Sequence, residues 1–207
     1  MPFQNAHLAI IEDNQSFAMV LSNLFDSVQL KFTHYTTAEA FLNDAPQKIT
    51  CIICDIRLPG MSGLQLQQEL KVNNINTPLI FVSGHADVRM AVKSIQDGAK
   101  DFLTKPINNQ ELLDTVFSIL KAEHSQKHKQ TLQANFKKQI DSLTSRELSI
   151  LKLIAKGQSS KTIADELNIS KNTVEVHRAN LMQKMGVNSS SQLVAQAVAF
   201  GIIAVDF

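Results

Sequence analysis

The fold is decided by residues 50–63, TCIICDIRLPGMSG. Residues 51–54 form a short run of apolar and β-branched side chains, which is typical of a buried strand. Asp55 is the first charged residue after this run, and the Pro and Gly residues that follow it indicate a turn. Further strand-like runs, which predict four more strands, lie at residues 7–11, 30–34, 79–82 and 101–103.

Segments with helical spacing separate these strands. The first carries apolar residues at Phe17, Val20, Leu21, Leu24 and Phe25. The last begins near Asn108. Five strand–helix pairs in the first 120 residues predict a parallel sheet with helices on both faces. We therefore expect an α/β doubly wound, flavodoxin-like, five-stranded domain, which binds ligands beyond the carboxyl ends of its strands.

Polar residues follow four of the predicted strands. They are Glu12 and Asp13, Asp55, Ser83, and Lys105. A single Asp at a strand end is more often a cap or turn residue, but five such residues behind four strands favour a site. Three carboxylates at one sheet edge repel each other unless a cation neutralises them, and an all-oxygen site suits Mg²⁺. A hydroxyl and an ammonium suit phosphoryl oxygens. These residues predict a carboxylate that accepts a phosphoryl group beside Mg²⁺.

Charge is divided unevenly along the chain. Residues 1–120 carry 8 basic and 12 acidic residues, residues 121–141 carry 5 and 2, and residues 142–207 carry 7 and 5. The basic excess after residue 120 indicates an anionic partner for the C-terminal part. Residues 121–141 are polar, with sparse apolar positions at Leu132, Phe136 and Ile140. We expect the fifth helix to continue through them as an exposed helical linker.

The last 66 residues contain only helical patterns. Helices are expected at residues 143–155, 160–167, 171–185 and 191–200, with Ser170 and Gly186 bounding the third. A tight turn through Asn168 joins the second to the third. The third is expected to bury Val174, Leu181, Met182 and Met185. This pattern leaves two interpretations open: a small all-α helix-turn-helix domain that enters the DNA major groove, and a plain four-helix interaction module.

The two cysteines, Cys51 and Cys54, are interpreted as structural. Residues three apart on a strand point to opposite faces with Cα atoms about 10 Å apart, whereas a disulfide needs about 7 Å or less. The chain has no second Cys pair to complete a zinc site. Buried thiols suit a reducing cytoplasm, and no apolar run approaches the ~20 residues of a membrane helix. We expect a cytoplasmic protein.

Four motifs, IIEDN, CDIRLPGMSGL, FVSGHAD and DFLTKP, together resemble the receiver domain of two-component response regulators over residues 5–120. The resemblance implies that Asp55 is the phosphoacceptor. It implies that Mg²⁺ is held by Asp13, Asp55 and the backbone carbonyl of Arg57, and that Glu12 contacts the ion through water. Ser83 and Lys105 are implied to contact the phosphoryl group.

The receiver resemblance also implies a conformational switch. Ser83 and Phe102 take the positions of the switch residues. Ser83 stands where Thr is commoner and keeps the hydroxyl, whereas Phe102 stands where Tyr is commoner and lacks the phenolic hydroxyl. In the family the bond before Pro106 is cis.

Residues 143–185 are similar to the DNA-binding domain of the LuxR/NarL class, and the chain resembles FixJ-type transcriptional regulators over essentially its whole length. The resemblance implies a helix-turn-helix at residues 160–179 with recognition centred on residues 173–179. The outward face of the third helix carries Lys171, Asn172, Glu175, Val176, Ala179, Asn180 and Gln183. We expect DNA contacts at Lys171, Asn172, Thr173, Glu175, Val176, Ala179 and Asn180. Because they are positively charged, we expect phosphate contacts from Lys161, Lys171, Arg178 and Lys184.

Glu175 is an acidic residue on this otherwise DNA-facing surface. A helix-surface pair with Arg178 or Lys171 is one explanation of its presence, and a hydrogen bond from a cytosine amino group is the other. We favour the helix-surface pair.

The whole chain thus resembles a phosphorylation-activated, DNA-binding transcriptional regulator of a two-component system. We expect a receiver at residues 1–121, a helical linker at 122–140 and a DNA-binding domain at 141–207. The expected partners are a sensor histidine kinase, promoter DNA and a second copy of the chain on phosphorylation. RNA polymerase is a further candidate partner, and no membrane is expected.

Two other functional classes fit parts of the pattern. An aspartyl-phosphate phosphohydrolase also uses an Asp at a strand end with Mg²⁺, but such enzymes place a second acid two residues later, where this chain has Arg57. We therefore expect no enzyme and no catalytic residues. LuxR-type domains also follow acyl-homoserine-lactone pockets in quorum sensors, but the receiver motifs occupy that space here.

Overall fold

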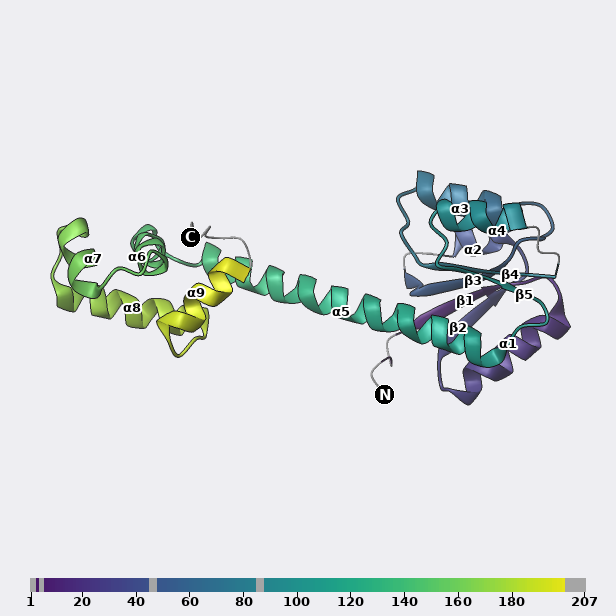
Figure 1. Cartoon of the computed structure of the whole chain (residues 1–207), viewed down its shortest axis with the longest axis horizontal. Helices are drawn as coiled ribbons and strands as arrows, with labels where there is room; N and C mark the ends of the chain where they lie inside the picture. Colours follow the sequence, from purple (N-terminus) through teal and green to yellow (C-terminus); the bar gives the residue numbers. More distant parts are fainter. Residues whose placement is uncertain (1–2, 4–5, 45–47, 85–87, 200–207) are drawn as a thin grey trace. The chain divides into compact units, whose positions relative to one another are not determined.

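A computed structural model of the chain describes residue 3 and residues 6–44, 48–84 and 88–199. The chain divides into two compact units, Met1–Gln126 and Lys127–Phe207 (Figure 1). Within the described ranges, no helix is both long enough and apolar enough to cross a membrane.

The first unit is built on a five-stranded sheet. Its strands are β1 (His7–Ile11), β2 (Lys31–Tyr35), β3 (Cys51–Asp55), β4 (Leu79–Ser83) and β5 (Asp101–Thr104). Their order is β2-β1-β3-β4-β5, and every neighbouring pair is parallel. Every residue of β3 and β4 is buried, because helices cover both faces of the central strands. The predicted doubly wound fold is confirmed.

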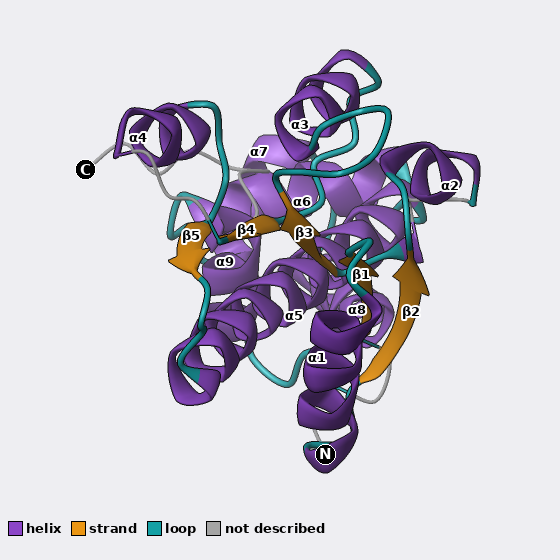
Figure 2. Cartoon of the chain, turned by 90° about the vertical axis from the view of Figure 1, so that its right-hand side faces the viewer, coloured by secondary structure: helices purple, strands orange, loops and turns teal. Residues whose placement is uncertain are grey.

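Helices cover the sheet on both sides. They are α1 (Gln15–Ser27), α2 (Ala38–Asn43), α3 (Gly63–Val72), α4 (Val88–Gln96) and the first part of α5 (Asn109–Asp141). Figure 2 shows α1 and α5 against one face and α2, α3 and α4 against the other. Phe25 of α1 and Val116 of α5 belong to one core cluster, and Phe41 of α2 and Leu66 of α3 belong to the other.

The cysteines confirm the strand interpretation. Cys51 lies in the core beneath α1 and α5, and Cys54 lies in the core beneath α2 and α3. Both thiols are free and buried. Burial raises the pKa of the Cys51 thiol to about 12, and it also raises the pKa of Cys54. Burial therefore disfavours the thiolate, the reactive form, at both positions.

The second unit contains α6 (Ser145–Ala155), α7 (Ser160–Leu167), α8 (Lys171–Met185) and α9 (Ser190–Ala199). These helices agree with the predicted ones to within two residues at their described ends, and the predicted end at Phe200 lies outside the described residues. Asn168 has a φ of 52°, in the left-handed region that Asn tolerates better than most residues, and so ends α7 sharply. Met182 is only partly buried, against expectation, whereas its neighbour Leu181 is fully buried.

Helix α5 is 33 residues long and runs on through the predicted linker. All residues from 124 to 135 are exposed, as expected of a linker. Phe136 differs, because it is 3% exposed and packs in the core formed by α6, α7, α8 and α9. Phe136 therefore belongs to the second core, and the expectation of an exposed linker is wrong at this residue.

Candidate functional site

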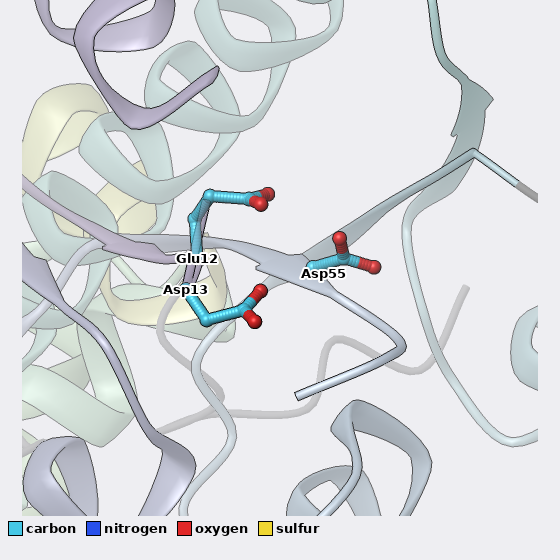
Figure 3. Close-up of side chains that lie close together, drawn as sticks. All are labelled: Glu12, Asp13 and Asp55. Carbon is cyan, nitrogen blue, oxygen red and sulfur yellow. The ribbon is translucent and has the colours of Figure 1, made fainter. Parts of the chain in front are cut away.

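Three carboxylates meet at one edge of the sheet in the first unit. Glu12 and Asp13 follow β1 directly, and Asp55 is the last residue of β3, the strand paired with β1. One oxygen from each carboxylate lies within 4.8 Å of the others. Figure 3 shows the three side chains gathered at the ends of these two strands. The carboxylate cluster that the strand pattern predicts is therefore formed.

Lys105 supplies the positive charge within this cluster. Its Nζ lies 2.7 Å from Glu12 Oε2 and 2.6 Å from Asp55 Oδ2. Burial raises the pKa of Glu12, against the effect of its hydrogen bond from Lys105. Burial disfavours the Lys105 ammonium, but its hydrogen bonds to Asp55 and Glu12 outweigh that cost and raise its pKa. Lys105 therefore stays charged and stabilises the carboxylates.

The backbone around Asp55 fixes the orientation of its carboxylate. The Arg57 N–H donates to Asp55 Oδ1 at 3.0 Å, while Lys105 Nζ donates to the other oxygen. Gly63, the first residue of α3, passes close to the strand end, so that a Cβ there would lie 2.5 Å from the Asp55 carbonyl oxygen. Sequence reasoning missed Gly63; the SG pair at the start of a helical pattern was the available signal.

Ser83 and Phe102 lie on the neighbouring strands. Ser83 ends β4 and is buried, and its carbonyl oxygen accepts a hydrogen bond from the Lys105 N–H at 2.9 Å. The Lys105–Pro106 peptide bond is cis. Phe102 of β5 is partly buried against the core beneath α2 and α3, which also contains Cys54. The structure thus brings Ser83 and Lys105 to the edge where Asp55 lies.

The donor set fits a magnesium ion. Glu12 and Asp55 are buried, whereas Asp13 is exposed and gives solvent access to the cluster. Carboxylate oxygens are the ligands that Mg²⁺ takes in proteins, usually with several waters retained. An ion here would relieve the repulsion among the three carboxylates, two of which pair with Lys105.

Sequence reasoning also missed a contact of Lys105 with the first helix. Lys105 Nζ lies 4.1 Å from the centroid of the Phe17 ring. The spacing of Phe17 with Leu21 and Phe25 marks it as a core residue, and nothing in that pattern indicates a cation above its ring.

The exposed face of α8 is the second candidate site. Ser170 caps this helix by accepting from the Thr173 N–H, and Val174 and Leu181 are buried on its inner side. The predicted DNA-facing residues that are exposed are Lys171, Asn172, Thr173, Glu175, Val176, Ala179 and Asn180. Lys161 on α7 is also exposed. The outward side chains of α8 therefore match the face expected from the sequence.

Two of the predicted phosphate-contacting side chains have partners within the second unit. Arg178 Nη2 donates to Ser190 Oγ at 2.7 Å. Lys184 Nζ lies 2.7 Å from Oε2 of Glu147, which is 3% exposed and also caps α6 through Thr144. Burial works against the Glu147 carboxylate, but its hydrogen bonds from Lys184 and Thr144 lower its pKa. Both cations therefore have structural roles that the helical pattern did not reveal.

The favoured pairing of Glu175 is wrong for this structure. Within the described part of the chain, Glu175 makes no salt bridge with Arg178 or Lys171. The guanidinium of Arg178 donates instead to Ser190 at the start of α9. Pairing with Arg178 or Lys171 therefore does not explain why the acidic Glu175 lies on the face expected to contact DNA.

Family models match both units. The model described as a response regulator receiver domain matches residues 8–117, and the model described as bacterial regulatory proteins of the luxR family matches residues 141–197. The doubly wound sheet is thus a receiver domain, and the luxR match decides against a plain interaction module. The chain belongs to the transcriptional response regulators that join a receiver domain to a LuxR-type DNA-binding domain.

Individual relatives agree over nearly the whole chain. Response regulator protein TodT from Pseudomonas putida is 41% identical over 186 residues, which are 89% of this chain and 82% of TodT. The solved structure of response regulator StyR has 33% identity and a TM-score of 0.81, and the match covers 94% of this chain and 99% of StyR. Full-length FixJ from B. japonicum has 32% identity and a TM-score of 0.60, with 97% and 100% covered. The FixJ-type resemblance is confirmed.

Proposed function

We propose that Asp55 accepts a phosphoryl group from a sensor histidine kinase and that this reaction activates DNA binding. The observation that carries the proposal is the convergence of Glu12, Asp13 and Asp55 with the Lys105 ammonium at the carboxyl edge of the sheet. Ligands of doubly wound sheets bind at this edge. Since bacterial promoter DNA lies in the cytoplasm, we infer a cytoplasmic location.

In the proposed reaction, an Asp55 carboxylate oxygen forms a bond to phosphorus while the bond between phosphorus and the donor nitrogen breaks. Lys105 turns from the carboxylate oxygen that it contacts toward a phosphoryl oxygen. The Ser83 hydroxyl donates to another phosphoryl oxygen. Positioning and charge neutralisation are the main requirements of phosphoryl transfer, and these groups supply both.

The proposed metal site uses the same edge. Asp13, Asp55 and the backbone carbonyl of Arg57 would hold Mg²⁺, and Glu12 would reach it through water. The bound ion neutralises charge on the phosphoryl oxygens. The side chain of Arg57 is exposed and offers no second acid of the kind that a phosphohydrolase needs. We therefore infer a regulator without an enzymatic activity of its own.

Phosphorylation is proposed to change the face made by α4, β5 and α5. Ser83 moves toward the phosphoryl group, and Phe102 rotates inward behind it. Helix α4 carries three apolar residues at helical spacing, Val88, Val92 and Ile95. These side chains are 77%, 50% and 44% exposed, so they form an uncovered apolar stripe. A second copy of the chain covers this stripe in the proposed dimer. A full switch from 1:99 to 99:1 requires about 5.5 kcal/mol of difference between the states.

The dimer then places two copies of α8 on two half-sites of promoter DNA. Base edges face Asn172, Thr173, Glu175, Val176, Ala179 and Asn180, and phosphates face Lys161, Lys171, Arg178 and Lys184. In this proposal the receiver spans residues 1–121, the helical linker spans 122–140 and the DNA-binding domain spans 141–207. RNA polymerase remains a candidate partner at the promoter.

The test is phosphorylation of the full chain by a small acyl phosphate with Mg²⁺, followed by intact mass spectrometry and light scattering. Wild type is expected to gain one phosphoryl group and to shift from monomer to dimer. Asp55→Asn is expected to do neither, and Asp13→Asn to need more Mg²⁺ because one anionic ligand is lost. A phosphoryl group that persists in Asp55→Asn would refute the assignment of Asp55.

A further inference from the structure

Phe17 lies beside the phosphoacceptor site but comes from a different element from the residues described there. The Asn14 side chain caps α1 by accepting from the Phe17 N–H at 3.0 Å, so the ring belongs to the first turn after Asp13. The side chain is partly buried against the core beneath α1 and α5. The cap thus fixes the backbone that carries the ring toward Lys105.

The Lys105 ammonium has two hydrogen-bond acceptors and one aromatic ring among its contacts. One N–H donates to Glu12 Oε2 and one to Asp55 Oδ2. The Phe17 ring centroid lies 4.1 Å from the same nitrogen, well within the range in which an aromatic face attracts an ammonium. The ring therefore lies against the same ammonium that donates to the two buried carboxylates.

We propose that Phe17 is a positioning residue that holds the Lys105 ammonium in place and thereby sets the rate at which Asp55 gains a phosphoryl group. This inference rests on the phosphoacceptor role proposed above. A charged group stabilises developing charge best when it is already oriented before the reaction. Without the ring, the ammonium gains alternative hydrated positions, and fewer molecules present it toward the incoming phosphoryl oxygens.

A residue needed only for core packing would tolerate different substitutions from one that holds an ammonium. For packing, any apolar side chain of similar volume suffices, whereas holding an ammonium needs the negative face of an aromatic ring. Phe17→Leu and Phe17→Met keep apolar volume and remove the ring. Phe17→Tyr keeps the ring and is the matched control.

The experiment uses the full chain with a small acyl phosphate and Mg²⁺. We expect Phe17→Leu to be phosphorylated about three- to tenfold more slowly than wild type, and Phe17→Tyr to stay within about twofold of wild type. Mg²⁺ affinity, measured by calorimetry, is expected to stay unchanged in both variants. Exchange of the Lys105 ammonium protons, followed by NMR in the unphosphorylated chain, is expected to become faster only in Phe17→Leu.

Each outcome decides the inference. Equal phosphorylation rates in wild type and Phe17→Leu would overturn it, as would an equal loss of rate in Phe17→Leu and Phe17→Tyr. If Phe17→Leu fails to fold, Phe17→Met gives the same comparison. If wild type gains no phosphoryl group on Asp55, the proposed function fails, and the inference about Phe17 fails with it. If wild type is phosphorylated but at the same rate as Phe17→Leu, only the inference about Phe17 fails.

Discussion

The receiver and the DNA-binding unit use charge in opposite ways. In the receiver, Lys105 joins Glu12 and Asp55, which lie 93 and 50 residues away from it in sequence, and the two carboxylates are buried. In the DNA-binding unit, Lys161 and Lys171 are exposed on α7 and α8 and make no salt bridge to any residue that the structure describes. The receiver site is a network, whereas Lys161 and Lys171 are separate side chains on the DNA-facing surface.

This difference decides how substitutions combine. Residues that share partners in one network show large interaction energies, whereas separate exposed residues act almost additively. The DNA-binding unit has its own network too, between Lys184 and Glu147, but that pair supports the fold. Network membership, and not charge as such, should therefore determine the size of each substitution's effect.

Removal of Lys105 is expected to have the largest effect. Lys105→Met leaves two buried carboxylates beside Asp13 without their cation, so the receiver should lose about 3 kcal/mol of unfolding free energy, the low end for a buried pair because Lys105 is 19% exposed. Mg²⁺ should restore part of this loss, because it neutralises the same three carboxylates. Hydrogen exchange of the β1 and β3 amides measures both effects.

The exposed Lys100 provides the control for this prediction. Lys100→Met should change the unfolding free energy by less than about 0.5 kcal/mol. Equal stability of Lys100→Met and Lys105→Met would show that the cluster needs no internal cation.

An intermediate effect is expected at Lys184. The Lys184 side chain is 37% exposed, so solvent weakens the pair, and Lys184→Ala should cost the DNA-binding unit about 1–2 kcal/mol. Because the pKa of Glu147 is lowered in the folded state, the pair stabilises above the unfolded pKa of about 4.3. That stabilisation should disappear as the pH falls through the folded pKa.

Thermal unfolding between pH 3 and pH 6 measures this dependence, with the pH range chosen around the ordinary Glu pKa of about 4.3. Glu147→Gln should lack the contribution of this group, and Lys161→Ala should keep the wild-type profile. A wild-type profile in Glu147→Gln would contradict the role of the pair.

The smallest effect on stability is expected on the exposed DNA face, where the readout is binding. Lys161→Ala should weaken binding evenly across sequences and reduce the salt slope by about one unit. Glu175→Ala should instead relax the preference at one operator position if its carboxylate accepts from a cytosine amino group. Selection from a random DNA library distinguishes a uniform loss of binding from a relaxed preference at one position. An unchanged preference in Glu175→Ala would exclude direct readout by Glu175.

The local pattern predicts the strands well because a buried parallel strand is a short apolar run that ends at its first polar residue. All five observed strands begin and end within one residue of the predicted bounds. The same rule predicts that Glu12, Asp55 and Lys105 meet, since parallel strands present their carboxyl ends at one edge. Local patterns do not predict which side chain each lysine contacts, because those contacts join elements that are distant in sequence.

The sequence by itself determined the doubly wound sheet, the residues at its carboxyl edge and the outward face of α8, because apolar periodicity alone decides which side of an element is buried. Only the tertiary structure decided the partners of single cations. Lys105 meets the Phe17 ring, Lys184 meets Glu147 across 37 residues, and Arg178 turns to Ser190. The physical reason is that a long cationic side chain reaches several neighbours, and packing between helices selects one of them.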